Sequence, residues 1–222
     1  MFKTQVIVFG ALFGSASLSV QAGVEQSFDV PSFTRIAASQ GVEVNISMGL
    51  PAQVVASAET DQDLQRLEIE VDDGELRVRR GSWSSSIWNW GTSNGKVSVN
   101  VVVPKLEGLA SSSGANVTAI DIDCDELSLD ASSGSRLAVS GHCNDIDVDA
   151  SSGARIESGE FMSRSVSVNA SSGASIDIFA SDTFQGDASS GASVNVYGVP
   201  RVFETDTSSG ARITREEPRE LI

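Results

Sequence analysis

The most regular feature of the chain is a small polar hexapeptide that recurs between stretches of alternating apolar and polar residues. Its copies are DASSGS, DASSGA, NASSGA and DASSGA, flanked by the weaker copies ASSSGA and DTSSGA. Their glycines are separated by 20, 19, 20, 18 and 19 residues and are Gly114, Gly134, Gly153, Gly173, Gly191 and Gly210. A period near twenty that persists over so many copies is typical of a solenoid, in which each repeat packs on the next.

Apolar residues alternate with polar ones on both sides of each of these marker glycines, which indicates extended chain and not helix. The position five residues before the marker holds Leu109, Leu129, Val148 and Val168, then Gly186 and Thr205. A repeat of this length is long enough for one coil of a parallel β-helix. We therefore predict an all-β, single-domain β-helix. Its expected core residues are Leu129, Val148, Val168, Leu137, Ile156, Ile176 and Val194.

The hexapeptide itself is explained by a bend in each coil. Stacked Ala and Ser side chains fit where the coil narrows, and glycine relieves the backbone at the bend. The alternative for a strand-rich chain is a β-sandwich of short hairpins. We disfavour it because we find no Asn-Gly or Asp-Gly hairpin turns between the expected strands.

The expected coils divide the chain into unequal parts. Residues 104–215 hold the repeat coils, and 216–222 form a charged C-terminal tail. Residues 23–103 lack the hexapeptide and are interpreted as less regular opening coils, with one short helical turn in ETDQDLQ.

The two cysteines test the register of these coils. Cys124 and Cys143 each lie ten residues before the next marker glycine. They would therefore occupy the same position on adjacent coils, with Cα atoms about 5 Å apart, inside the range of disulfide geometry. We predict a disulfide between them, and the alternative is a pair of free buried thiols.

The first residues are predicted to be a targeting segment. Residues 1–22 contain one cation, Lys3, an uncharged apolar run from Val6 to Leu18, and small residues at the end, which is the pattern of a secretory signal peptide. The alternative, a membrane anchor, is disfavoured because the run is short for a bilayer. Without this segment the chain carries 14 basic and 30 acidic residues, a net charge of −16. That charge disfavours nucleic acid as a partner, and no later segment is apolar enough to cross a membrane.

Together these segments resemble the putative auto-transporter adhesin, head GIN domain family. The resemblance rests on FDVPSFTRIAASQGVEVNISMG, on AQVVASAETDQDLQRLEIEVDDGELRVR and on the ASSGA coils, and it covers residues 23–222. It implies a right-handed parallel β-helix on an exported bacterial protein, in the periplasm or at the cell surface. It implies no catalytic motif.

The residues offer little for catalysis. His142, interpreted as a solvated histidine on a turn, is the only histidine, and Lys96 and Lys105 are the only lysines after residue 22. No Ser-His-Asp set, metal-ligand spacing or phosphate loop is found, so we predict no enzyme, no catalytic residue and no cofactor. The alternative is a carbohydrate-active enzyme that uses acidic residues of a β-helix.

A row of acidic residues is the first candidate binding surface. Four residues before the markers stand Asp130, Asp149, Asn169, Asp187 and Asp206. If they stack, their like charges need neutralisation. We expect arginines two residues after the markers to supply it, namely Arg136, Arg155 and Arg212. Calcium is the alternative, since hard cations favour clustered carboxylates, although the calcium-binding nonapeptide of toxin repeats is absent.

The second candidate is an uncharged segment, GSWSSSIWNWGTSNG, that contains Trp83, Trp88 and Trp90. Exposed aromatic rings suit sugars or a protein partner, and the alternative is a lid folded over the apolar solenoid. The sequence thus predicts a non-enzymatic exported protein that presents a repetitive surface to a glycan or to another envelope protein. Its expected binding residues are these tryptophans with Asp130, Asp149, Asp187 and Asp206.

Overall fold

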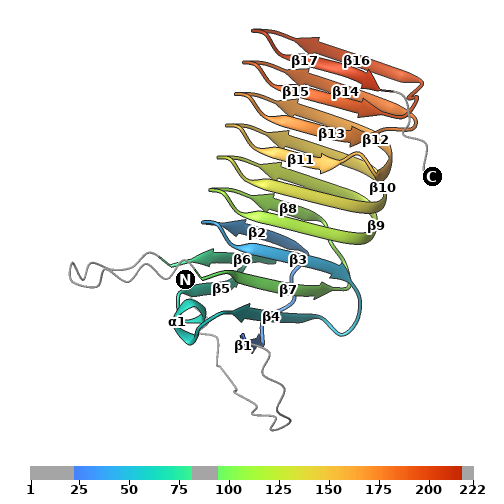
Figure 1. Cartoon of the computed structure of the whole chain (residues 1–222). Coiled ribbons are helices and arrows are strands. Elements are labelled where there is room, and N and C mark those ends of the chain that lie inside the picture. The colour runs from blue at the N-terminus through green and yellow to red at the C-terminus, as the bar shows by residue number, and fades with distance from the viewer. Residues whose placement is uncertain (1–22, 82–94, 217–222) are drawn as a thin grey trace.

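The computed structural model describes residues 23–81 and 95–216 and is a β-solenoid of stacked parallel coils (Figure 1). Each regular coil has two limbs joined by a tight turn. The limbs that precede the turns stack into the leading sheet, made of β2 (Arg35–Ser39), β8 (Gly108–Ser111), the second halves of β9 (Asn116–Ala131) and β10 (Arg136–Ala150), β12 (Phe161–Ala170), β14 (Thr183–Ala188) and β16 (Val202–Thr207).

The limbs that follow the turns stack into the trailing sheet on the other side of the core. It consists of β3 (Glu43–Met48), the first halves of β9 and β10, β11 (Arg155–Ser158), β13 (Ser175–Phe179), β15 (Ser193–Tyr197) and β17 (Arg212–Glu216). Parallel pairing throughout both sheets confirms the predicted all-β solenoid.

The turn between the limbs is built from two consecutive residues with left-handed backbone. Ser133 has φ 52° and Gly134 has φ 68°, and the pair closes a hydrogen bond from the Ser135 N–H to the Ser132 carbonyl at 3.2 Å. The Gly134 N–H also donates to the carbonyl of Ser152 in the next coil at 3.1 Å. Glycine tolerates this backbone and serine does not favour it, so each coil accepts strain that its neighbours offset.

The first regular coil lies earlier in the chain than the sequence indicated. Gln40 and Gly41 have φ 60° and 70°, and the Gly41 N–H donates to the Ser113 carbonyl, as the later glycines do to their neighbours. The limbs on either side, β2 and β3, pair in parallel with β8 and β9. The N-terminal portion, expected to be less regular, thus contains one regular coil, in which glutamine replaces the second serine of the hexapeptide.

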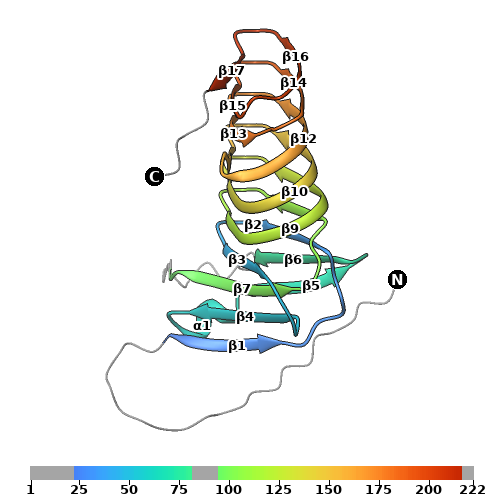
Figure 2. The same ribbon diagram turned by 90° about the vertical axis from the view of Figure 1, so that its right-hand side faces the viewer.

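The remaining N-terminal strands form a cap with antiparallel pairing, below the coils in Figure 2. It contains β1 (Val24–Phe28), β4 (Gln53–Ala58), β5 (Leu67–Asp72), β6 (Glu75–Arg80) and β7 (Val97–Val103), with the short helix α1 (Asp61–Leu64) where a helical turn was predicted. Strand β4 lies antiparallel between β1 and β7, while β6 and β7 pair in parallel with β2 and β3.

One turn of this cap contradicts a prediction made from the sequence. Strands β5 and β6 form an antiparallel hairpin whose turn residues, Asp73 and Gly74, have φ 49° and 73°. An Asp-Gly hairpin is therefore present, although none was expected. It belongs to the cap and leaves the parallel coils unaffected.

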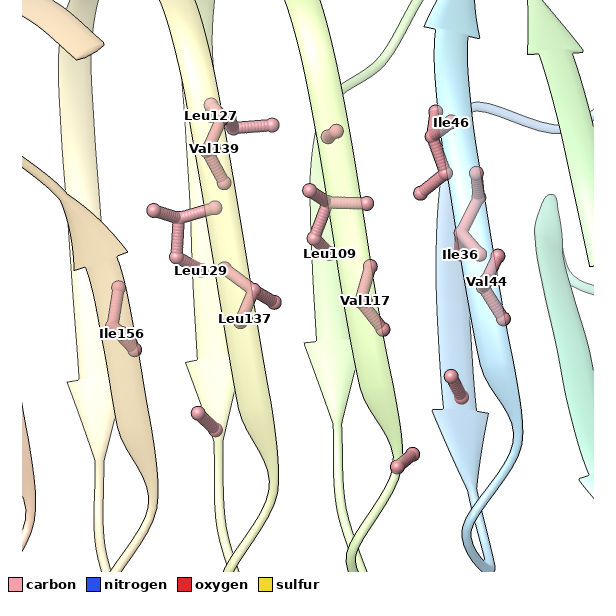
Figure 3. Close-up of a cluster of buried hydrophobic side chains, with 14 of the residues drawn as sticks. Ile36, Val44, Ile46, Leu109, Val117, Leu127, Leu129, Leu137, Val139 and Ile156 are labelled. Carbon is pink, nitrogen blue, oxygen red and sulfur yellow. The ribbon is translucent and has the colours of Figure 1, made fainter. Parts of the chain in front are cut away.

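The core lies between the two sheets as columns of stacked apolar side chains (Figure 3). All the predicted core residues are buried, with at most 1% of their surface exposed: Leu129, Val148, Val168, Leu137, Ile156, Ile176 and Val194. Alanines fill the narrow end near the turns, where Ala131 and Ala150 are each 4% exposed. Within the described ranges, no helix is long and apolar enough to cross a membrane.

Candidate functional site

The acidic row of the sequence is a continuous column on the outward face of the leading sheet. Asp130 pairs in register with Asp149, Asp149 with Asn169, Asn169 with Asp187, and Asp187 with Asp206. All five side chains are exposed. Because neighbouring strands are about 4.8 Å apart, the column repeats at that interval along the solenoid axis. The predicted stacking is confirmed, and we call this row the acidic column.

The column continues toward the cap through residues that the repeat did not reveal. Asp130 pairs with Ala110, Ala110 with Ala37, and Ala37 with Arg77 of the hairpin strand β6. One row of outward positions thus passes from a cation, through two alanines, to the carboxylates. The sequence signal for Arg77 is the basic run LRVRR, which follows the Asp-Gly turn.

A groove of about 900 Å³ follows this column along the axis. Its lining comes from eight successive strands, from β6 at the cap to β16 at the far end, so it is about 34 Å long at 4.8 Å per strand. The four coils that contribute β9, β10, β12 and β14 each supply the same three residues, an aspartate or asparagine, a buried alanine at the floor and a serine such as Ser151 or Ser171. The small hexapeptide therefore shapes the groove as well as the bend.

The carboxylates of the column have little compensation from the protein. Among the described residues, none of Asp130, Asp149, Asp187 and Asp206 forms an ion pair. The side chain of Asp130 reaches solvent, but its partial burial raises its pKa above the ordinary value of 3.8, and the charges of Asp149 and Asp147 add to the rise. A hydrogen bond from the Ser128 hydroxyl, at 3.2 Å, acts in the opposite direction.

The predicted neutralising arginines do not reach the column, so this prediction is wrong. Arg136 and Arg155 lie on the trailing limbs, and both form ion pairs there with Glu157, at 2.5 and 4.0 Å. Arg212 lies on the trailing strand β17, and among the described residues it has no ion pair with the column. The tight turn explains the error, since residues on its two sides face opposite surfaces of the solenoid.

The arginines that do line the groove are at its cap end and are already paired. Arg77 contacts Asp72 at 2.9 Å and Glu75 at 2.7 Å, and Arg79 contacts Glu68 at 2.7 Å. Hydrogen bonding to Glu75 is the main reason that the pKa of Arg77 is raised. The guanidinium groups of both residues are therefore directed to the acids of the cap.

A second groove, of about 910 Å³, follows the other edge of the same outward face. Its lining includes Asp145, Asp147, Ser165 and Ser167 of the leading sheet, and the half-buried Cys124. Cys124 forms the predicted disulfide with Cys143, with Cα atoms 4.7 Å apart on adjacent coils. The disulfide, and with it the coil register, is confirmed.

Two other expectations from the sequence have different outcomes. His142 lies within strand β10 and not on a turn, and its exposed ring is 3.7 Å from Asp123. Trp83, Trp88 and Trp90 lie outside the described residues.

In the described part of the chain, no three His, Cys, Asp or Glu side chains converge as a metal-binding group.

Comparison with known structures finds the same fold in bacterial proteins of very different sequence. A putative adhesin from Bacteroides fragilis aligns with a TM-score of 0.69 and 13% identity over 89% of this chain and 98% of its own. A putative lipid binding protein from Parabacteroides distasonis gives 0.54 and 12%, over 88% and 97%. A putative adhesin from Parabacteroides merdae gives 0.50 and 12%, over 88% and 96%.

Identities this low establish the fold alone. The comparison with curated proteins finds no match. The sequence itself matches a protein family over residues 32–200, a span that includes the hairpin of the cap, all but the last coil, and the groove except for Asp206 and Ser208. On this match the chain belongs to the putative auto-transporter adhesin, head GIN domain family.

Proposed function

We propose that the protein is a non-enzymatic, adhesin-like binding module of the bacterial cell envelope, and that it holds an extended glycan in the groove of the leading sheet. The observation that carries this proposal is the groove itself, in which successive coils offer the same carboxylate or amide, alanine floor and serine hydroxyl. A polymer lying along the axis would meet the same chemistry at every coil.

The spacing favours a polysaccharide over a peptide. Equivalent groups repeat about every 4.8 Å along the groove, whereas an extended peptide advances about 3.3 Å per residue and falls out of step. The sugar rings of an extended β-linked chain are separated by a distance close to the coil spacing. Carboxylates and serine hydroxyls both accept hydrogen bonds from sugar hydroxyls, and serine also donates. We further propose Trp83, Trp88 and Trp90 as sugar-stacking residues, on the basis of residue type.

The experiment is to block the groove and measure glycan binding. Ser151→Trp with Ser171→Trp places two indoles on adjacent coils of the groove, where both serines are part of the lining. Ser175→Trp with Ser193→Trp is the matched control, on adjacent coils of the trailing sheet. We expect binding to a panel of polysaccharides to be lost in the first pair and kept in the second. Equal binding by both pairs, or no binding by the wild type, would refute the proposal.

A carbohydrate-active enzyme is the second candidate, and one observation favours it. Asp130 and Asp149 are neighbours in the groove, and the raised pKa of Asp130 is the property required of a general acid beside an ionised carboxylate. Incubation with the same polysaccharides would distinguish the two functions. New reducing ends or unsaturated products, lost in Asp130→Asn, would establish the enzyme.

We also propose export to the periplasm or cell surface, based on the pattern of residues 1–22 and on the disulfide, which forms in oxidising compartments. The check is the intact mass of protein recovered from the envelope of the native host. A chain that begins at Gly23, with Cys124 and Cys143 oxidised, is the expected result. A cytosolic chain that retains residues 1–22 would contradict it.

A further inference from the structure

The outward face that contains the groove is strongly and selectively acidic. Its carboxylates, from β9 to β16, are Glu126, Asp130, Asp145, Asp147, Asp149, Asp187, Glu204 and Asp206. The basic side chains near this face all form ion pairs within the protein. Arg77 and Arg79 line the cap end of the groove and pair with acids of the cap, and Lys105 of the second groove pairs with Glu107 at 2.5 Å. Arg164 and Arg201 both pair with Asp182, at 3.5 and 2.5 Å. They contribute no free positive charge to the groove.

The opposite face shows that this asymmetry is more than the general acidity of the chain. On the trailing sheet, Arg136 and Arg155 flank Glu157, and Asp177 accepts a hydrogen bond from Asn195 at 2.8 Å. Charges of both signs are present there, and several are paired within the protein. On the leading sheet, no carboxylate of the acidic column forms an ion pair among the described residues, so the groove side presents a continuous row of uncompensated negative charge.

We propose that the glycan held in the groove carries free amino groups, so that its ammonium groups pair with the acidic column. This inference rests on the proposed function. The column places like charges about 4.8 Å apart in the folded protein, which is unfavourable unless a cation lies between them. Burial is the main cause of the raised pKa of Asp130, and the charges of Asp149 and Asp147 add to the rise, as this repulsion requires. An amino-bearing polymer relieves the repulsion wherever one of its ammonium groups lies between two carboxylates of the column.

The cap end of the groove gives the ligand a direction. The column passes from Arg77, through the uncharged Ala37 and Ala110, to the first carboxylate at Asp130. At the cap end, the guanidinium of Arg77 is held by Asp72 and Glu75 and the two alanines carry no charge, so an ammonium group finds an unpaired carboxylate of the column only from Asp130 onward. Uncharged or acetylated sugars therefore suit the cap end, and amino sugars suit the distal coils. A uniformly anionic polysaccharide is excluded from most of the groove.

The test compares two ligands that differ only in charge, an oligomer of β-1,4-linked glucosamine and its fully N-acetylated counterpart of the same length. We expect the amino form to bind at least tenfold more tightly at low salt, and added sodium chloride to reduce that preference. Asp149→Asn with Asp187→Asn should weaken binding of the amino form about tenfold, since exposed ion pairs contribute up to about 1 kcal/mol each. Asn169 shows that an amide fits the column.

The control variant removes the same number of negative charges from the surface outside the groove. Glu43→Gln with Glu160→Gln alters two exposed carboxylates outside the groove lining and should leave the affinity unchanged. In the other direction, Asn169→Asp completes the column and should tighten binding of the amino form about threefold. Melting temperatures and circular dichroism confirm that each variant is folded before its affinity is compared.

The outcomes separate this inference from the proposed function. Equal affinity for the amino and acetylated oligomers, with loss of both on blocking the groove, would overturn the amino-sugar inference and leave glycan binding intact. No binding of either oligomer or of any polysaccharide would overturn both. Equal or tighter binding of polylysine, with the same dependence on Asp149 and Asp187, would show a cationic peptide as the partner and also overturn the inference.

Discussion

The ring of Phe184 occupies the space into which a side chain at Gly186 would project. A Cβ atom added to Gly186 would lie 2.7 Å from two ring atoms of Phe184 and 3.1 Å from Cδ1 of Ile213. In the coil before, the same two positions hold Val166 and Val168. Two medium side chains are thus replaced by one large ring and one glycine, and Phe184 then stacks on Phe203 at 5.2 Å.

This exchange predicts strong coupling between the two positions. Gly186→Val alone should destabilise the protein by about 1–3 kcal/mol through overpacking, and Phe184→Val alone by about 2–4 kcal/mol through a cavity. The double variant copies the preceding coil, so its loss of unfolding free energy should be smaller than the sum of the two single losses by about 1 kcal/mol or more. Urea denaturation of the four proteins measures the difference. Additive losses would show that the two sites are independent.

The disulfide is expected to contribute a measurable part of the free energy of unfolding. Cys124 and Cys143 close a loop with a sequence separation of 19, for which the chain-entropy model gives about 3 kcal/mol. Replacing both with serine should lower the denaturation midpoint accordingly, without loss of strand content. Reduction of the wild type should give a similar shift. If the reduced and oxidised proteins unfold at the same urea concentration, the bridge contributes nothing to stability.

Removing one charge from the acidic column is expected to increase the stability of the folded protein in a pH-dependent way. The folded-state pKa of Asp130 is raised above 3.8, chiefly by burial, so its ionisation costs the folded state more than the unfolded state. This destabilisation is absent below pH 3.8 and is complete once the pH exceeds the raised value. Asp130→Asn should therefore raise the melting temperature at about pH 7 but not at about pH 3.

The reverse substitution provides the matched control for this prediction. Asn169→Asp adds a carboxylate between Asp149 and Asp187 in the same column and should lower the melting temperature only near neutral pH. A gain from Asp130→Asn that persists in acid would assign the effect to packing and not to charge.

The C-terminal coil carries inward polar side chains that are expected to prevent self-association at this end. Arg215 stands in a core column above Val196, and its guanidinium lies 5.4 Å from the centre of the Phe203 ring and donates to the Pro200 carbonyl. Thr205 and Thr207 likewise occupy inward positions that hold Gly186 and Ala188 one coil earlier. Inward polar groups on an edge coil discourage pairing with another edge.

Arg215→Val should therefore shift the protein toward larger species by light scattering, relative to wild type at the same concentration. Arg212→Val, on the outward side of the same strand, is the control and should cause a much smaller shift. Identical behaviour of Arg215→Val and wild type would show that the guanidinium does not protect this end.

The repeating part of the structure could be predicted from the sequence because each position is sampled once per coil. Leu129 and Val148 share a column, as do Cys124 and Cys143, and matches of this kind at a constant period are characteristic of stacked coils. The acidic column followed from the same periodicity. Its groove did not, since the concavity depends on how sharply the backbone bends at residues such as Ser133 and Gly134.

The cap could not be derived in this way because its strands occur once. Its hairpin carries a single Asp73-Gly74 signal with no repeat to support it, and in the first coil Gln40 replaces the serine that marks the later turns. The wrong role for Arg136 had a different cause. Distance along the chain suggested proximity to Asp130, whereas the left-handed turn between them reverses the face on which a side chain emerges.

The glycine-to-serine hydrogen bonds between successive turns make the coil a unit of length as well as of folding. Each added repeat would extend the groove by about 4.8 Å and supply one more aspartate, alanine and serine, without altering the cap or Arg215. Under the proposed function, the length of glycan held is proportional to the length of the gene, and duplication of a single repeat lengthens the bound glycan by about one sugar. Loss of a repeat shortens it by the same step, so the protein can be matched to chains of different size without any change of recognition chemistry.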